Sequence, residues 1–161
     1  MKLKIYQIDA FTNILFKGNP AAVIPLNKWL PQKKMQLIAS ENNLSETAFF
    51  KKEGEFFHIR WFTPSSEVEL CGHATLASAF VIFKIFNVTS KKIIFKSLSG
   101  ILIVKIIDEL ITLDFPSQRI FKKNKIPNLL IKGLGIRPEL CFYNEDFLMI
   151  YKSEDQIFNI V

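Results

Sequence analysis

Alternation of apolar and polar residues runs through much of this chain and is typical of β-strands with one buried face. Residues 2–11 alternate in this way from the start of the chain. Similar patterns, separated by turn-forming residues, predict further strands over residues 21–26, 47–52, 55–63, 93–97, 101–107 and 109–115. Gly54 and Gly100 lie between neighbouring strands of this set, and each predicts a hairpin turn.

Two segments have the pattern of helices. Residues 31–42 place Met35 and Ile38 on one side, and Pro31 suits a first helical turn. Residues 72–86 are apolar on nearly every side, and a helix without a clear polar face belongs in a core. Together with the strands, these helices predict an α+β fold.

A change of composition predicts a domain boundary. Residues 117–127 are basic and polar and contain proline, which is typical of a linker. We therefore divide the chain into a first domain, residues 1–116, and a linker with the beginning of a second domain, residues 117–161. The later part predicts a short helix over residues 126–134, a strand over 147–151 and a helix start at 153–155.

Length and composition limit what such a chain can be. With 161 residues and 49% hydrophobic content, it can bury one core, or one core and an incomplete neighbour. Lys84 interrupts the longest apolar run, so no stretch of about 18 apolar residues predicts a membrane span. The first residues lack the apolar core of a signal peptide. Two cysteines, Cys71 and Cys141, then indicate reduced thiols and a cytoplasmic protein.

The formal charge of +6 raises the question of a nucleic-acid partner. The lysines, however, occur as pairs at the predicted ends of strands and helices rather than in one patch. Aromatic residues occupy alternating, core-type positions and not positions between basic residues. We interpret the lysines as solubilising surface residues and expect no nucleic-acid partner. Salt-sensitive binding to DNA or RNA would contradict this interpretation.

The segment with the clearest chemistry is residues 69–79, with the sequence ELCGHATLASA. It leads from a polar strand end directly into the apolar helix. A helix N-terminus presents free backbone N–H groups and a partial positive charge, which favour a bound anion. Cys71, Gly72 and His73 place a thiol, an open backbone and an imidazole beside such a carboxylate site. This pattern predicts the mouth of an active site.

A second segment, NLSETAFF at residues 43–50, sets Glu46 among small and aromatic residues just before an apolar strand. Three segments together resemble the PhzF-like family, that is, the phenazine-biosynthesis isomerase and its relatives. They are this segment, RWFTPSSEVELCGHATLASA at residues 60–79 and QIDAFTNILFKGNPAAVIPL at residues 7–26. The resemblance covers the whole chain, because ITLDFPSQ and a weaker C-terminal segment follow in the family's order.

The resemblance implies a diaminopimelate-epimerase-like fold, in which a curled, mostly antiparallel sheet or barrel surrounds a central buried helix. It implies that Glu46 is the acid/base residue and that Gly72 and His73 line the substrate pocket. The expected activity is a proton-transfer isomerisation or epimerisation of a small carboxylated metabolite, with neither a metal nor an organic cofactor. A carboxyl group among apolar neighbours can both take and return a proton near neutral pH.

Each candidate residue also has a structural interpretation. Glu46 could be a surface residue paired with a lysine, and His73 a satisfied core histidine. At a helix N-terminus His73 is expected to be neutral. Asn19, in the GNPAAV turn, either orients the substrate or only forms the turn. His58 is interpreted as structural.

Cys71 raises a separate question. Epimerases and racemases of this superfold use two opposed cysteines, whereas Cys141 lacks a second Cys-Gly motif. We therefore interpret Cys71 as a small packed residue that lines the substrate pocket.

Family members usually continue into a second half with a GDPVTG-like motif, and this motif does not occur in the 161 residues. The chain resembles the first domain and the opening of the second. The alternative to an active enzyme is therefore an inactive half-site, or a binding or dimerisation module that needs a separately encoded second half. We also expect a homodimer, because relatives commonly dimerise.

Overall fold

The computed structural model describes residues 2–115, 117 and 119–160. The chain forms two compact units, Met1–Phe115 and Pro116–Val161. The first unit contains all the candidate residues, Asn19, Glu46, Cys71, Gly72 and His73.

The first unit is built on one eight-stranded sheet, in the order β1-β2-β3-β4-β6-β7-β8, with the short β5 paired to β4. Most pairs are antiparallel, whereas β2 with β3 and β4 with β6 are parallel. The strands are β1 (Tyr6–Ala10), β2 (Asn19–Leu26), β3 (Glu46–Glu53), β4 (Phe56–Phe62), β5 (Glu67–Val68), β6 (Lys92–Ser97), β7 (Gly100–Ile107) and β8 (Leu110–Asp114). Both predicted hairpins are confirmed.

The first strand is shorter than predicted. Pairing with β2 begins only at Tyr6, opposite Val23. Before it, Leu3 packs against a different apolar cluster on the other face of the sheet. The alternation over residues 2–5 therefore reflects local packing and not a longer strand.

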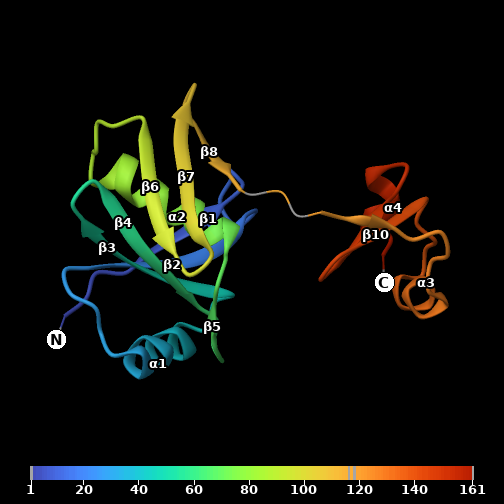
Figure 1. The fold of residues 1–161 in the computed structure, drawn as a ribbon, viewed down its shortest axis with the longest axis horizontal. Helices are drawn as coiled ribbons and strands as arrows, with labels where there is room; N and C mark the ends of the chain where they lie inside the picture. Colours follow the sequence, from blue (N-terminus) through green and yellow to red (C-terminus); the bar gives the residue numbers. More distant parts are fainter. Residues whose placement is uncertain (1, 116, 118, 161) are drawn as a thin grey trace. The chain divides into compact units, whose positions relative to one another are not determined.

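The sheet curls around the helix α2 (Gly72–Phe80), which contacts β1, β2, β3 and β8 (Figure 1). Ala74, Ala77 and Ala79 are buried against the sheet, because small side chains let the helix approach closely. The helix continues as a π-helical segment, η1 (Val81–Ile85). Asn87 follows in the left-handed conformation, at φ 52°. The predicted helix over residues 72–86 is thus confirmed, with a π-helical last turn.

The prediction that this helix is buried on every side is wrong at its C-terminal end. Phe80, Ile85 and Phe86 are exposed. The sheet curls over only part of the helix surface, so these side chains lie on the part that it leaves uncovered.

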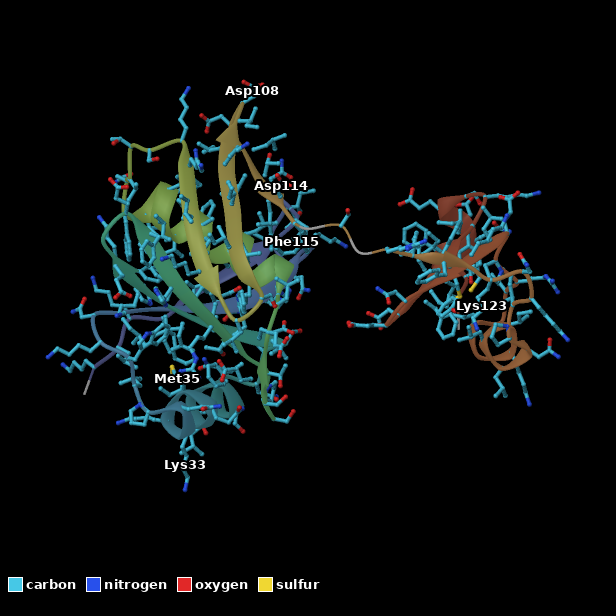
Figure 2. The ribbon with its side chains drawn as sticks, viewed as in Figure 1. Lys33, Met35, Asp108, Asp114, Phe115 and Lys123 are labelled. Atoms are coloured by element: carbon cyan, nitrogen blue, oxygen red, sulfur yellow. The ribbon has the colours of Figure 1, made fainter. Side chains whose placement is uncertain are left out.

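Helix α1 (Gln32–Asn42) packs on the opposite face of the sheet. Figure 2 shows Met35 pointing from α1 toward the sheet and Lys33 pointing away from it. Met35 is fully buried against a cluster of apolar side chains that includes Phe49 and Phe62. Pro31 lies one residue before the helix, where its carbonyl group accepts hydrogen bonds from the backbone N–H groups of Lys34 and Met35.

The second unit contains a three-stranded sheet in the order β11-β10-β9 and two short helices. These elements are β9 (Phe121–Lys122), α3 (Asn128–Leu134), β10 (Leu140–Tyr143), β11 (Phe147–Ile150) and α4 (Glu154–Phe158). The predicted helices and the later strand are confirmed, whereas β9 and β10 were not predicted. Across the residues described in both units, no helix has the length and apolar character needed to cross a membrane.

Candidate active site

Glu46 is the first residue of β3, and the strand's alternation directs its side chain toward α2. Ala48 and Phe50, on the same face of β3, are buried in the core around α2. Thr47 lies on the opposite face, where its hydroxyl group accepts a hydrogen bond from Asn42 Nδ2 at 3.1 Å. The end of α1 and the start of β3 therefore fix which face Glu46 takes.

The segment before α2 is anchored by an ion pair. Glu67 in β5 accepts two hydrogen bonds from the guanidinium group of Arg60 in β4, at 2.6 Å and 2.7 Å. Such a two-point pair has a defined geometry, so it holds the segment that leads to Cys71.

Cys71 is the N-cap residue of α2. It has an extended backbone, and its side chain makes no capping hydrogen bond. The first backbone N–H groups of the helix, from Gly72 onward, have no acceptor within the helix. Together with the helix dipole, they form a site suited to a carboxylate or another anion.

Glu46, His73 and Cys71 come together at this helix start. His73 Nε2 lies 3.2 Å from Glu46 Oε2, and His73 Nδ1 lies 3.4 Å from Cys71 Sγ. His73 is buried, with 8% of its surface exposed. The imidazole ring is thus placed between the carboxylate and the thiol.

The contact between Glu46 and His73 is close but not aligned as a hydrogen bond. Among the described residues, neither Glu46 Oε2 nor His73 Nε2 has a hydrogen-bond partner, although both atoms are buried. Buried polar atoms of this kind are rare in folded proteins, because each costs about 1–3 kcal/mol when left unpaired. Two such atoms facing each other make this position a candidate ligand site.

Cys71 is held in its protonated form. Burial raises the pKa of its thiol from 9.0 to about 12; the neighbouring Glu46 carboxylate adds to the rise, whereas the backbone N–H groups of Ala74 and His73 oppose it. A thiol with this pKa is a poor base near neutral pH.

Two aromatic rings border the site and were not predicted from the sequence. A Cβ atom added at Gly72 would lie 3.2 Å from Phe115 Cε2, so the glycine lets this ring pack on the helix start. Figure 2 shows Phe115 directly after β8. The ring of Phe11 lies 6.4 Å from that of His73, centroid to centroid. The only hint in the sequence was their place at strand ends, next to turn-forming residues.

Asn19 begins β2 and is half-buried. It lies on the same strand face as Ala21, whose partner in β3 is Glu46. This places Asn19 at the same edge of the sheet as Glu46. The neighbouring Gly18 has a packing role, because a Cβ atom there would collide with the carbonyl oxygen of Ala10. Both roles considered for Asn19 fit this position.

His58, unlike His73, lies at the protein surface. It lies in β4 with 38% of its side chain exposed, and its Nε2 lies 3.1 Å from Glu53 Oε2. This surface pair agrees with a structural role.

A cavity of about 1170 Å³ lies beside the candidate site and not at it. Its lining comes from the end of β1, the loop over residues 11–16, the start of β8 and the residues Leu76 and Phe80 of α2. Phe11 is shared, since it lines the cavity and its ring also lies near His73. Glu46, Cys71 and His73 do not line this cavity, so the buried cluster is a separate, narrower site.

Comparisons with known proteins agree with this architecture. Residues 8–137 match the family model PhzC-PhzF, described as phenazine biosynthesis-like protein. An uncharacterized isomerase of Pseudomonas aeruginosa is 44% identical over 158 residues, which are 98% of this chain and 60% of that protein. The human phenazine biosynthesis-like domain-containing protein is 50% identical over 168 aligned residues, covering 96% of this chain and 58% of the human protein.

Solved structures give the same result. The crystal structure of a PhzF-family phenazine biosynthesis protein of Enterococcus faecalis matches with a TM-score of 0.93 and 44% identity, over 100% of this chain and 62% of that one. A protein of Pseudomonas aeruginosa named as a predicted epimerase matches at 14% identity with a TM-score of 0.71, which shows a shared fold. The family resemblance and the α+β, diaminopimelate-epimerase-like fold expected from the sequence are both confirmed. The chain spans about 60% of the length of these relatives.

Proposed function

Because the chain belongs to the PhzC-PhzF family of phenazine biosynthesis-like proteins, we propose that it carries the acid/base part of an isomerase site for small carboxylated metabolites. The observation that carries the proposal is the pair Glu46 and His73, whose facing atoms are buried and otherwise unpaired at the start of α2. The isomerase name of a 44% identical relative supports the reaction class.

Substrate binding would use the helix start. A substrate carboxylate would accept hydrogen bonds from the backbone N–H groups around Gly72 and His73, where the helix dipole favours negative charge. The ring of Phe115, which packs on Gly72, would exclude water from this position. Exclusion of water strengthens these hydrogen bonds, because the local dielectric constant falls.

Proton transfer would use Glu46. Its carboxylate would remove a proton from a carbon next to the substrate carboxylate or to an unsaturated group. The electron pair left on that carbon would delocalise into the neighbouring group, and the helix N–H groups would stabilise the developing charge. Glu46 would then return the proton to the same or another carbon. His73 would orient the substrate and Glu46, and the protonated Cys71 would be a packing residue.

The proposal assigns no metal or organic cofactor to this reaction. A carbon acid activated by its own neighbouring carboxylate or double bond needs a base, a proton donor and a stabilised anion. Glu46 and the helix N–H groups supply these three functions.

Solvent-deuterium incorporation tests the acid/base role directly. A panel of small carboxylated metabolites would be incubated in deuterated water with the chain, and the label followed by mass spectrometry. We expect whatever incorporation the chain gives to fall by about 100-fold or more in Glu46→Gln, because the amide cannot act as a base. The matched control is Glu53→Gln, at a surface glutamate in the same strand. Equal exchange by Glu46→Gln and the parent chain would contradict the mechanism.

The chain matches only about 60% of the length of its relatives. This motivates a second candidate function, in which the chain supplies one half of the active site. About 40% of the length of such a relative lies outside the matched part, and a closed site can need groups from that part. The same assay would be repeated with a supplied polypeptide that corresponds to the unmatched part of a relative. We expect weak carboxylate binding near His73 and little exchange by the chain alone, with exchange rising when the second polypeptide is added. Efficient exchange by the chain alone would contradict the half-site.

A further inference from the structure

The buried cluster has a second chemical capacity that the proton-transfer reaction does not use. Glu46, Cys71 and His73 each offer one potential metal-ligand atom, and these three atoms lie within 4.8 Å of one another. A carboxylate oxygen, a thiolate sulfur and an imidazole nitrogen together form a ligand set that suits Zn²⁺ among the divalent ions.

The spacing is close to what coordination requires. In a tetrahedral zinc site, bond lengths of about 2.0–2.3 Å place neighbouring ligand atoms about 3.5 Å apart. Two contacts have about this length, 3.2 Å from Glu46 Oε2 to His73 Nε2 and 3.4 Å from Cys71 Sγ to His73 Nδ1. They involve different ring nitrogens of His73, and one ion binds only one of the two. One ligand atom from each residue lies within 4.8 Å of the others, so binding requires the imidazole ring to turn and present one nitrogen to the ion shared with Glu46 and Cys71.

An independent observation points to a ligand at this position. His73 Nε2 and Glu46 Oε2 are buried and lack hydrogen-bond partners among the described residues. A cation would satisfy a lone pair on either atom. The positive end of α2 opposes a cation, but two anionic ligands, the carboxylate and a thiolate, compensate for it.

We propose that Glu46, Cys71 and His73 form an inhibitory Zn²⁺ site at the start of α2. Zn²⁺ displaces the thiol proton of Cys71, which passes to solvent, and it takes one oxygen of Glu46 and one ring nitrogen of His73. A water molecule completes the fourth position. The metal holds the carboxylate that would otherwise move the substrate proton. The inhibition rests on the proposed function, whereas the metal site does not.

Co²⁺ is the probe for this site, because it accepts the same ligands as Zn²⁺ and absorbs light when bound to a thiolate. The reduced 161-residue chain would be titrated with Co²⁺ alone in buffer without chelators. We expect a thiolate-to-cobalt charge-transfer band that saturates at one ion per chain and disappears when Zn²⁺ is added. Absence of the band would overturn the proposal.

The chain offers a matched control for two of the three ligands, since it contains two cysteines and two histidines. We expect Cys71→Ser to lose the band and His73→Gln to weaken Co²⁺ binding at least about tenfold. Cys141→Ser and His58→Gln should bind as the parent chain does. A band that persists in Cys71→Ser, or is lost in Cys141→Ser, would overturn the site. If Cys71→Ser does not fold, Glu46→Gln joins His73→Gln as the test, and unchanged binding in both would overturn the proposal.

The deuterium assay separates this proposal from the function on which its inhibition rests. Exchange that depends on Glu46 and stops with one equivalent of Zn²⁺ would support both proposals. A cobalt band with no exchange, even when the second polypeptide is supplied, would support the metal site and count against the isomerase function. Exchange that depends on Glu46 in a chain that gives no band would overturn the metal site alone.

Discussion

Glu46 and His73 lie far apart in the sequence and meet at 3.2 Å in the folded chain. The strand alternation of β3 directs Glu46 toward α2, and the first turn of α2 presents His73. Each residue alone is an ordinary polar side chain. Their burial without aligned partners makes the pair a candidate site, because unpaired buried polar groups cost stability that a binding or catalytic role explains.

Cys71 provides a prediction at the same scale. Its pKa of about 12, against 9.0 for an ordinary thiol, corresponds to a thiolate fraction about 1000-fold smaller near neutral pH. In Cys141→Ser, where Cys71 is the remaining cysteine, we expect the rate of alkylation by iodoacetamide to rise about tenfold per pH unit from about pH 8 to about pH 11. In denaturant the increase of the alkylation rate should level off near pH 9.0, the ordinary pKa of a thiol. Levelling at that pH in the folded chain would contradict the raised pKa.

The same pKa has a consequence for stability. A pKa that is raised in the folded state means that folding favours the protonated thiol. This contribution is fully present below about pH 9 and is lost as the pH rises toward 12. We expect the parent chain to lose stability over that range by more than Cys71→Ala does, as measured by urea denaturation.

At the level of elements, the sheet is covered differently on its two faces. α2 lies within the curl, on the face that carries Glu46, whereas α1 covers the other face through a smaller apolar cluster. The end of α1 also contributes Asn42, which binds Thr47 beside Glu46. Helix α1 therefore helps to position the start of β3, whereas the candidate site residues lie on other elements.

Met35 tests how much α1 stabilises the first unit. Its side chain is fully buried, so Met35→Ala should lower the free energy of unfolding by about 2–5 kcal/mol. Lys33→Ala, on the exposed side of the same helix, should change it by less than about 0.5 kcal/mol. Trp29 and Trp61 both belong to the first unit, so tryptophan fluorescence during urea denaturation reports on it. A loss below about 1 kcal/mol in Met35→Ala would show that the cluster is not tightly packed.

For the whole molecule, exposed apolar side chains are the main feature. Phe11, Leu15 and Phe16 are exposed in one loop of the first unit, and Leu129 and Phe158 are exposed in the second unit. β1 and β8 end the large sheet, and among the described residues each has a strand partner on one side alone. Such edges and apolar surfaces favour association in water.

We therefore expect the chain to form a homodimer or a larger assembly. Sedimentation velocity over a range of concentrations would measure this. Because the chain carries a formal charge of +6, association driven by apolar surface should persist or strengthen at high salt, where repulsion between chains is screened. A clean monomer at high concentration would contradict the expectation, and association that disappears at high salt would indicate an electrostatic origin instead.

Periodicity and turn residues alone determined most of the secondary structure, because alternation and helical spacing are local properties. They predicted the hairpin turns at Gly54 and Gly100, the long central helix and the α+β class. The family resemblance predicted Glu46, Gly72 and His73 as candidate site residues. Local patterns did not predict β9 and β10, two short strands of the second unit. They also placed the start of the first strand at residue 2, whereas β1 begins at Tyr6.

The tertiary structure alone decided which groups meet. Sequence spacing could not show that Cys71, His73 and Glu46 present ligand atoms within 4.8 Å of one another, because Glu46 comes from a different element. It also could not show that Phe115 packs on Gly72, or that burial holds Cys71 protonated. Contacts and burial depend on how the sheet curls around α2. That curl arises from the packing of all its strands together and from no single segment of the chain.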